Sequence, residues 1–325
     1  MNSTGDSNEP SERKTPSVLI LTGTTASGKT DISIPLAEVL KGEIVGADSR
    51  QIYRELDIGT AKPTTEQLQR VPHHFVAEKS LAERWTAGDF AREARQRIAQ
   101  IIARGHVPIV VGGAMLYLRA LTDGLYAEDA LEHADYSALR EELTARGADR
   151  LYTELQECDP ALASRTSPRD HHRILRGLAV WRACGIRLSD LHDHAAEPLP
   201  WPFRIYFLFG DRNETYDRVD HRVIAMVDAG LVEEVRALAE RGLNEANCNA
   251  LRTHGYQEVF PYLRGEITRE RMIENIRMAV RHYVKRQLTW FRRDPRVTWI
   301  RRDFDEPPEI VARRIADDFL RAVND

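Results

Sequence analysis

Residues 17–30 read "SVLILTGTTASGKT", a short apolar run that leads directly into a glycine-rich loop. In this loop, Gly23, Gly28, Lys29 and Thr30 stand at the four constrained positions of a phosphate-binding loop. Such a loop lies between a strand and a helix, because its backbone N–H groups and the helix dipole together attract negative charge. Apolar residues recur at helical spacing after Thr30, so a helix is expected to follow the loop, as a phosphate-binding loop requires. The stretch therefore predicts a phosphate site at the end of a buried strand.

The side chains of the loop have separate expected roles. Lys29 brings a mobile positive charge, and the hydroxyl of Thr30 can ligate Mg²⁺. We therefore expect Mg²⁺ as the cofactor and Thr30 as its protein ligand. The residues expected to bind the phosphates are Gly23, Thr25, Ala26, Ser27, Gly28, Lys29 and Thr30.

Further short apolar runs follow along the chain, and they are continuous rather than alternating. Continuous runs are typical of a parallel sheet that is covered on both faces. They alternate with amphipathic stretches such as "FAREARQRIAQIIARG" (residues 90–105), which indicate helices. We therefore predict an α/β protein whose core resembles the P-loop NTPases and contains a parallel sheet. The predicted strands are residues 17–22, 42–49, 72–78, 107–113 and 203–210, of which 72–78 is the weakest.

Residues 124–200 interrupt this order, because they contain helical stretches and no convincing strand. An apolar strand follows at 203–210, so the helical part is predicted to be an insertion between two strands of one core. The first 16 residues are polar and are expected to be a disordered tail. The predicted parts are therefore the tail at 1–16, the core at 17–123 and 201–325, and the helical insertion domain at 124–200.

The 325 residues carry a net charge of −4, with 42% hydrophobic and 30% charged residues. This composition suits a globular protein and neither indicates nor excludes a nucleic-acid partner. The three cysteines are widely spaced and form no C-x-x-C pair, so neither a disulfide framework nor a zinc finger is expected. No apolar run reaches the ~20 residues that cross a bilayer, and the N-terminus lacks a secretory signal. We therefore expect a cytoplasmic protein with no membrane partner.

Asp48 follows the second predicted strand and is the only strand-end acid near the loop. An ATPase would need an acid on a later strand to hold Mg²⁺, but the strand at 107–113 ends in Gly112 and Gly113. In small P-loop kinases, a group at the place of Asp48 faces the acceptor. Asp48 is therefore a candidate base on the acceptor side, with helix capping in "ADSRQIY" as the structural alternative.

Ten segments match, in order, the sequence pattern of one enzyme family. They are "GTTASGKT", "ADSRQIY", "DIGTAKP", "PHHF", "TAGDF", "VVGGAMLYLRAL", "SPRDHHRILRGL", "GLVEEVRAL", "HGYQEV" and "KRQLTWFR". Over nearly the whole chain after residue 16, the sequence resembles the tRNA dimethylallyltransferases, also called tRNA isopentenyltransferases. The resemblance implies a prenyltransferase that moves a dimethylallyl group from dimethylallyl pyrophosphate to a tRNA. The acceptor would be the exocyclic amine of the adenine 3′-adjacent to the anticodon in certain tRNAs, and the product isopentenyladenosine.

The same resemblance implies roles for individual residues. The phosphate loop would bind the pyrophosphate of the donor, and Arg222, the matching position in "YDRVDHR", would contact it as well. Asp48, Lys29 and Arg222 are then the catalytic candidates. The amine of adenine is a weak nucleophile, so a carboxylate that accepts its proton would assist the reaction. For Arg222, the structural alternative is an ordinary arginine on the surface of a helix.

Basic residues cluster late in the chain. From Arg269 to Arg296 there are nine Lys or Arg against three Asp or Glu, with Tyr283, Trp290 and Phe291 among them. Such a segment can grip phosphates and stack bases, although a solvated helix with ordinary core aromatics has the same composition. With the family match, the predicted contacts to the tRNA anticodon stem-loop are Asp48, Ser49, Arg50, Gln51, Ala114, His172, Arg173, Arg176, Arg252, Gly255, Tyr256, Lys285, Arg286, Gln287, Trp290 and Arg292.

The chain departs from the family pattern at Ala114, where a threonine usually follows the glycine pair. Three alternative functions remain open: a P-loop kinase of a small molecule, a prenyltransferase of free adenine nucleotides, and a catalytically weak tRNA-binding paralogue. The helical insertion and the basic C-terminal segment argue against the first two, whereas Ala114 suggests the third. We expect the protein to be a monomer.

Overall fold

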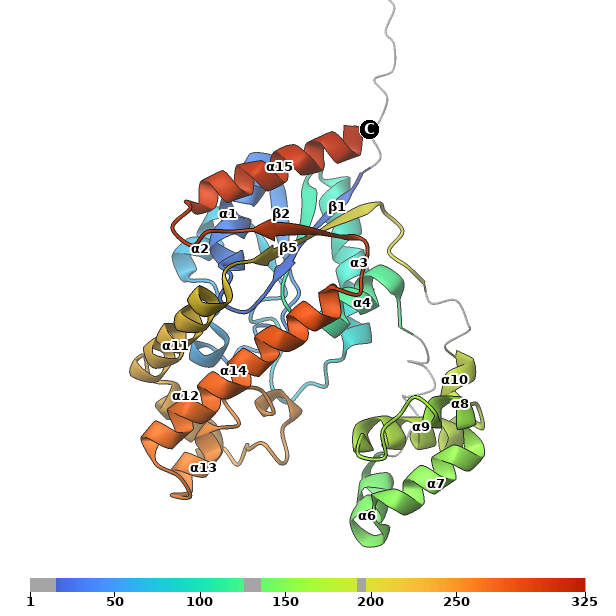
Figure 1. Cartoon of the computed structure of the whole chain (residues 1–325). Helices are drawn as coiled ribbons and strands as arrows, with labels where there is room; N and C mark the ends of the chain where they lie inside the picture. Colours follow the sequence, from blue (N-terminus) through green and yellow to red (C-terminus); the bar gives the residue numbers. More distant parts are fainter. Residues whose placement is uncertain (1–15, 126–135, 192–196, 325) are drawn as a thin grey trace, which may run out of the picture. The chain divides into compact units, whose positions relative to one another are not determined.

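The computed structural model describes residues 16–125, 136–191 and 197–324 of the chain. Its centre is a six-stranded sheet in which all neighbouring strands run parallel, which confirms the predicted α/β class. The order β3-β2-β4-β1-β5-β6 places β1, which leads into the phosphate loop, between β4 and β5 (Figure 1). The strands are β1 (Val18–Gly23), β2 (Gly42–Gly46), β3 (His73–His74), β4 (Val107–Val111), β5 (Phe203–Phe209) and β6 (Val297–Arg301).

Helices cover both faces of the sheet. On one face, α1 and α15 lie side by side and share one apolar core with β1, β4 and β5 (Figure 1). On the other face, the ring of Phe207 in β5 lies 5.0 Å from that of Phe291 at the end of α14. Cover on both faces explains why every residue of β1 is buried and apolar or small. The helices around the sheet are α1 (Lys29–Leu40), α2 (Thr65–Arg70), α3 (Ala87–Ala103), α4 (Met115–Asp123) and α15 (Pro308–Asn324).

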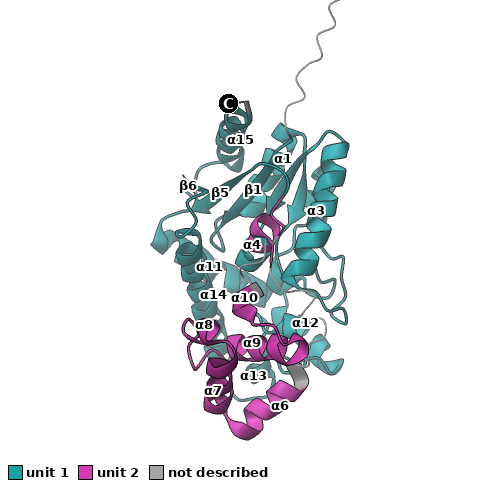
Figure 2. Ribbon diagram, turned by 90° about the vertical axis from the view of Figure 1, so that its right-hand side faces the viewer, with its two compact units in different colours: residues 1–118, 200–325 teal, residues 119–199 magenta. Residues whose placement is uncertain are grey.

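The chain divides into two compact units (Figure 2). Unit 1 comprises residues 1–118 and 200–325, and unit 2 comprises residues 119–199, against the insertion of 124–200 expected from the sequence. The described part of unit 2 contains helices and no strand, and leucines of α7, α8 and α9 dominate an apolar core of its own. Its helices are α6 (Tyr136–Arg146), α7 (Ala148–Cys158), α8 (Pro160–Ala163), α9 (His171–Cys184) and α10 (Leu188–Leu191).

After β5, unit 1 continues as a group of helices that ends in the long helix α14. The helical stretch from Arg212 to Glu240 divides at Gly230, whose φ of 105° lies in the left-handed region that favours glycine. A helix cannot continue through that conformation, so two helices form in place of one. The elements of this part are η1 (Ile58–Thr60), α11 (Arg212–Asp228), α12 (Leu231–Glu240), η2 (Asn249–Leu251), α13 (Val259–Leu263) and α14 (Arg269–Phe291).

The edge strand β6 was not predicted from the sequence. It pairs with β5 from Ile205 opposite Val297 to Phe209 opposite Arg301. Only one of its sides has a neighbouring strand, so its residues are partly exposed and its sequence lacks the continuous apolar run of the inner strands. The strand matters for the site, because it carries the chain to Arg302 beside the phosphate loop.

Two other sequence-based expectations concern the ends of the chain and the membrane. The polar tail expected at 1–16 lies outside the described residues, apart from Pro16. Among the helices of the three described ranges, none has the length and apolar character required to span a bilayer.

Candidate active site

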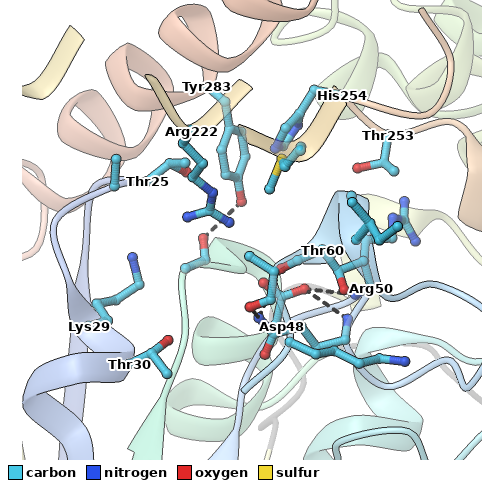
Figure 3. A pocket seen from close by; sticks show the side chains of 18 of the residues that line it. Thr25, Lys29, Thr30, Asp48, Arg50, Thr60, Arg222, Thr253, His254 and Tyr283 are labelled. Atoms are coloured by element: carbon cyan, nitrogen blue, oxygen red, sulfur yellow. Dashed lines mark hydrogen bonds between the residues drawn. The ribbon is translucent and has the colours of Figure 1, made fainter. Parts of the chain in front are cut away.

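A cavity of about 1410 Å³ opens within unit 1 beyond the carboxyl ends of β1, β2 and β4 (Figure 3). Sites of α/β proteins lie at this edge of the sheet, because the loops after parallel strands meet there. The phosphate loop, the segment after β2 and side chains of α11 and α14 surround the cavity. The predicted site residues that line it are Thr25, Ala26, Gly28, Lys29, Thr30, Asp48, Ser49, Arg50, Gln51, Ala114, Arg222, Arg252, Arg286 and Gln287.

The side chain of Lys29 is folded back onto its own loop. Its Nζ donates hydrogen bonds to the carbonyl oxygens of Gly23 (3.0 Å) and Thr24 (2.9 Å). Burial, and then the positive charge of Arg222, lower the pKa of Lys29 to about 8, against an ordinary value of 10.5. Both effects disfavour a positive charge at this place, so an anion in the cavity would stabilise the charged form.

The backbone of the phosphate loop is held from outside the loop. Ala26 (φ 66°) and Gly28 (φ 79°) adopt left-handed conformations, which for alanine cost roughly 1–2 kcal/mol. Arg218 Nε donates a hydrogen bond to the carbonyl oxygen of Ala26 (3.1 Å), and Arg302 donates one to that of Ser27 (2.9 Å). These bonds turn two carbonyl oxygens toward the arginines. Of the predicted loop residues, Gly23 and Ser27 are buried and do not line the cavity.

Gln287, a predicted tRNA contact, has a different place in the structure. Its side chain is 1% exposed, because α14 turns this residue toward the core. The backbone N–H of Thr25 donates to Oε1 of Gln287 (2.9 Å), and Nε2 of Gln287 donates to the carbonyl oxygen of Gly113 (3.1 Å). The two ends of the amide therefore join the phosphate loop to the end of β4, so Gln287 is a structural bridge. Its contact with tRNA stays a prediction.

Arg222 of α11 extends its guanidinium into the cavity between Lys29 and the ring of Tyr283 (Figure 3). Within the described residues, this guanidinium has no hydrogen-bond or ion-pair partner. Burial lowers the pKa of Arg222, and the negative charges of Asp48 and Asp31 oppose that effect. The alternative of an ordinary surface arginine is therefore not what the structure shows.

Asp48 caps a turn and faces the cavity at the same time. Its Oδ1 accepts hydrogen bonds from the backbone N–H groups of Arg50 (2.8 Å) and Gln51 (3.2 Å). The helix capping raised from the sequence differs from this, because residues 49–52 form turns and no helix begins there. The carboxylate also opposes the burial of Lys29 and Arg222 electrostatically, so the three charges share one space. Capping occupies only Oδ1, and the second oxygen is left for a substrate.

Two aromatic rings also line the cavity: Tyr283, one of the aromatics noted in the basic segment, and His254, which was not among the predicted site residues. His254 and Tyr283 lie with their ring centroids 4.8 Å apart (Figure 3). Burial, with the positive charges of Arg222 and Arg286 in addition, lowers the pKa of His254 to about 4 despite the opposing charge of Asp48. The imidazole is therefore neutral near pH 7, and the pair offers flat, uncharged surface of the kind on which a base can stack.

Residues 57–61, "DIGTA", form the wall beyond Asp48. Nε2 of Gln51 donates to the carbonyl oxygens of Thr60 (3.0 Å) and Ala61 (3.1 Å), which ties this wall to the segment that Asp48 caps. On the other side, the carboxylate of Glu234 accepts the backbone N–H of Ile58 at 2.8 Å. The wall is thus fastened at both of its ends.

Tyr256, another predicted tRNA contact, supports this wall from below. It is fully buried, and its hydroxyl donates a hydrogen bond to Glu234. Its ring packs so closely on Gly59 that a Cβ at that glycine would lie 2.3 Å from a ring carbon. Tyr256 therefore positions residues 57–61, and its contact with tRNA stays a prediction.

Other predicted tRNA contacts lie on exposed surface of unit 1. Lys285, Arg286 and Trp290 are exposed on α14, and Arg292, which follows the helix as its C-cap, is exposed as well. Arg252 is exposed as well and donates to the carbonyl oxygens of Glu245 and Ala246 (2.6 Å each). Gly255, next to the buried Tyr256, has a φ of 98° and donates its N–H to Glu258 (2.7 Å).

In unit 2, three predicted tRNA contacts share the helix α9. His172 and Arg173 are exposed in its first turn, and Arg176 is half-buried one turn later. Asp170 caps the helix by accepting the N–H of Arg173, and it also forms an ion pair with that side chain at 3.5 Å. The three residues therefore lie on one exposed, basic face of unit 2.

Arg218 and Arg302 contact the phosphate loop and were not predicted from the sequence. A signal existed for Arg218, because it precedes Arg222 by four residues and so shares its face of α11. Arg302 had no signal, since it follows an unrecognised strand and lies 275 residues from its partner Ser27.

The cavity offers oxygen ligands for a metal ion. The hydroxyl of Thr30 and the carboxylates of Asp31 and Asp48 are among its lining groups. In the part of the chain that the structure describes, no three His, Cys, Asp or Glu side chains are grouped as a metal site. Mg²⁺ is commonly held by one or two protein oxygens together with substrate phosphates and water, so this set fits Mg²⁺ only with a phosphate-bearing ligand.

The sequence model of a family described as IPP transferase matches residues 51–294, about three quarters of the chain. The chain belongs to the IPP transferase family. Among curated relatives, the tRNA dimethylallyltransferase of Salinibacter ruber is 42% identical over 282 residues, which are 87% of each protein. The tRNA dimethylallyltransferase 1 of Syntrophotalea carbinolica is 41% identical over 95% of this chain and 98% of its own.

Solved structures agree with the sequence comparisons. The full-length tRNA isopentenylpyrophosphate transferase of Bacillus halodurans superimposes with a TM-score of 0.68 at 33% identity, covering 95% of this chain and 98% of its own. A eukaryotic dimethylallyltransferase acting on tRNA gives a TM-score of 0.81 at 26% identity, covering 94% and 80%. The predicted fold class and family resemblance are confirmed.

Proposed function

We propose that this protein moves a dimethylallyl group from dimethylallyl pyrophosphate to the exocyclic amine of the adenine 3′-adjacent to the anticodon in certain tRNAs. The observation that carries the proposal is a single cavity in which Lys29 and Arg222 face Asp48. The two cations suit an anionic leaving group, and the carboxylate suits an amine that must lose a proton. The names of the relatives support the same reaction.

At the donor side, pyrophosphate would lie on the N–H groups of the phosphate loop. Lys29 would exchange its bonds to the carbonyl oxygens of Gly23 and Thr24 for bonds to phosphate oxygens. Arg222, which has no partner among the described residues, would add a second cation. Negative charge builds on the pyrophosphate as its bond to the prenyl carbon breaks, so these groups stabilise the transition state more than the ground state.

At the acceptor side, the adenine amine would form a bond to the prenyl carbon and lose one proton. That proton would pass to the oxygen of Asp48 that does not cap the turn. The base must leave its stack to reach Asp48, as in other enzymes that modify bases. The adjacent rings of His254 and Tyr283 would give it a flat surface.

Mg²⁺ belongs to this proposal as the cofactor. When bound, it would supply further positive charge to the leaving pyrophosphate. The hydroxyl of Thr30 would be its protein ligand, with the remaining ligands from pyrophosphate and water.

The exposed basic residues extend the proposal to tRNA. The exposed side of α14 and the basic face of α9 carry cations that would bind backbone phosphates of the anticodon stem-loop. Contacts of this kind supply affinity without base specificity, and the cavity would select the base. We further propose that the protein acts as a monomer in the cytoplasm, where its tRNA substrate occurs.

The test is a transfer assay with labelled dimethylallyl pyrophosphate, bulk tRNA and Mg²⁺. We expect label in tRNA, and isopentenyladenosine after nuclease digestion. Parallel reactions replace tRNA with AMP, or replace the prenyl donor with labelled ATP and small acceptors. Transfer only to AMP would support a prenyltransferase of free nucleotides, and release of ADP would support a kinase. Tight tRNA binding without transfer would support a catalytically weak paralogue.

A further inference from the structure

A buried arginine that follows β6 contacts the phosphate loop, and the proposed reaction does not explain its surroundings. Arg302 follows β6 and is 4% exposed. Its guanidinium donates to the carbonyl oxygen of Ser27 (2.9 Å), and its Nε has no hydrogen-bond partner. Within the described residues, no carboxylate lies within ion-pair distance of it. A buried cation without a counter-charge is unfavourable, so something else must balance it.

The contact between Arg302 and the loop is very close. A Cβ added to Gly28 would lie 1.7 Å from a guanidinium nitrogen of Arg302, so this cation lies directly behind the residue that opens α1. Gly28 also lines the cavity on its other side. One loop residue therefore separates the guanidinium from the space in which an anion would bind.

Arg218 acts on the neighbouring peptide. Its Nε holds the carbonyl oxygen of Ala26, the residue in the left-handed conformation. The guanidinium groups of Arg218 and Arg302 lie 4.4 and 5.8 Å from the ring centroid of Phe304, which supports both from behind. Two successive carbonyl oxygens, those of Ala26 and Ser27, thus point to arginines.

We infer that Arg302 is a positioning residue of the donor site. It orients the Ser27 peptide so that loop N–H groups face the cavity, and its charge lies behind the loop to attract the pyrophosphate. The assignment rests on the proposed function only for the identity of the donor. It adds the C-terminal edge strand to the parts of the fold on which donor binding depends.

The positive charge of Arg302 is not balanced by a carboxylate within ion-pair distance among the described residues. Burial and the nearby positive charge of Arg218 lower the pKa of Arg302, and Asp31 and Glu306 oppose this only from beyond ion-pair distance. A pyrophosphate on the other side of Gly28 would supply the missing negative charge in a region of low dielectric constant. Donor binding and the burial of Arg302 would then stabilise each other.

The test compares three variants. Arg302→Met keeps an unbranched apolar stem and removes the charge and the hydrogen-bond donors, whereas Arg302→Lys keeps the charge and loses the planar fork. Arg301→Met is the matched control, because Arg301 is the next residue in the chain but its side chain is 71% exposed and forms an ion pair with Asp303 instead of contacting the loop. Each variant is checked by thermal unfolding and titrated with inorganic pyrophosphate and Mg²⁺ by calorimetry.

We expect Arg302→Met to weaken pyrophosphate binding and raise the donor KM about tenfold, with the tRNA KM unchanged. Arg302→Lys is expected to recover part of the loss, and Arg301→Met to match the wild type. A folded Arg302→Met protein with wild-type pyrophosphate affinity would overturn the inference, as would equal rises in both KM values. If Arg302→Met does not fold, wild-type affinity in Arg302→Lys overturns it and an intermediate affinity supports it.

These outcomes remain distinct from failure of the proposed function. Pyrophosphate titration needs no prenyl transfer, so it reports on Arg302 even if the wild-type protein transfers nothing to tRNA. Conversely, a wild type that transfers label while Arg302→Met binds pyrophosphate normally would refute only the role of Arg302.

Discussion

The two walls of the cavity are built in different ways. The phosphate loop (residues 23–30) is held by side chains from the last third of the chain, namely Arg218, Gln287 and Arg302. The acceptor wall (residues 48–61) is held mainly by its own polar groups and by hydrogen bonds to residues 77–81, which follow soon after it in the chain. Glu234, Arg241 and Tyr256 reach it from farther along the chain.

The difference matches what each wall would bind. Pyrophosphate is small and highly charged, so its N–H donors and cations must be held in one geometry. An adenine that turns out of a tRNA brings a large and adaptable partner, for which a locally stabilised segment is sufficient. Charge follows the same division, because Lys29 and Arg222 lie on the donor side and Asp48 on the acceptor side.

The largest effect is expected from removing the carboxylate on the acceptor side. Asp48→Ala should lower the rate of transfer by about 10² to 10⁴-fold, because the amine loses its proton acceptor. Asp48→Asn is the matched variant, since its amide oxygen can still cap the turn. We expect Asn to be as inactive as Ala but more stable, by about 1 kcal/mol of unfolding free energy. Single-turnover rates and chemical denaturation measure both, and tRNA affinity should stay within a few-fold. Wild-type rates in either variant would remove Asp48 from the mechanism.

The next largest effect is expected from removing a cation on the donor side. Lys29→Ala should lower donor affinity and the transfer rate, together by roughly 10²-fold, because pyrophosphate loses a direct cationic partner. The tRNA affinity should not change, which distinguishes this variant from a general loss of structure. Steady-state KM values for the two substrates measure the difference, and an unchanged donor KM would contradict it.

The pKa of Lys29 adds a test by pH. With a pKa of about 8 in the free protein, Lys29 is charged at pH 7 and neutral at pH 9. Affinity for pyrophosphate should therefore fall as the pH rises through about 8, and Lys29→Ala should lack this step. Because the unfolded lysine keeps its proton up to about pH 10.5, this group makes the free protein more stable as pH rises between about 8 and 10.5. A pyrophosphate titration with the same slope in both proteins would refute the assignment.

A smaller effect is expected from adding a hydrogen-bond donor on the donor side. Ala114 lines the cavity just after β4, where a threonine hydroxyl could donate a hydrogen bond to the donor's phosphate oxygens. Ala114→Thr is expected to raise the transfer rate at least several-fold without changing tRNA affinity, since one donor to developing negative charge can contribute up to roughly 10² to 10³-fold. Single-turnover rates decide the matter. An equal or lower rate would mean that other groups already replace the hydroxyl.

The smallest effect concerns the support of the acceptor wall. Tyr256→Phe removes only the hydroxyl that bonds Glu234 and leaves the ring against Gly59. We expect a loss of about 1 kcal/mol in unfolding free energy and a tRNA KM that rises a few-fold, with the donor KM unchanged. A shift confined to the donor KM would contradict the separation of the two walls.

Some of this site could be predicted from local sequence and some could not. The spacing of Gly23, Gly28, Lys29 and Thr30 encodes a loop whose chemistry lies in its own backbone, so the pattern identified it. By contrast, Gln287 lies in a basic segment, and nothing local shows that α14 turns it to the core. The same holds for Tyr256, whose neighbours in sequence are polar but whose ring is buried. A contact pattern inherited from a family does not show which side of a helix faces inward in this chain.

The sequence by itself determined the phosphate loop, the α/β class, the position of Asp48 at a strand end and the resemblance to tRNA dimethylallyltransferases. These features depend on residues that are close together in the chain, or on continuous apolar runs with one physical meaning. Only the tertiary structure decided that Lys29, Arg222 and Asp48 share one cavity and that Arg302 lies behind Gly28. Arg302 and its hydrogen-bond partner Ser27 are 275 residues apart, and the order of the parallel strands brings such residues together.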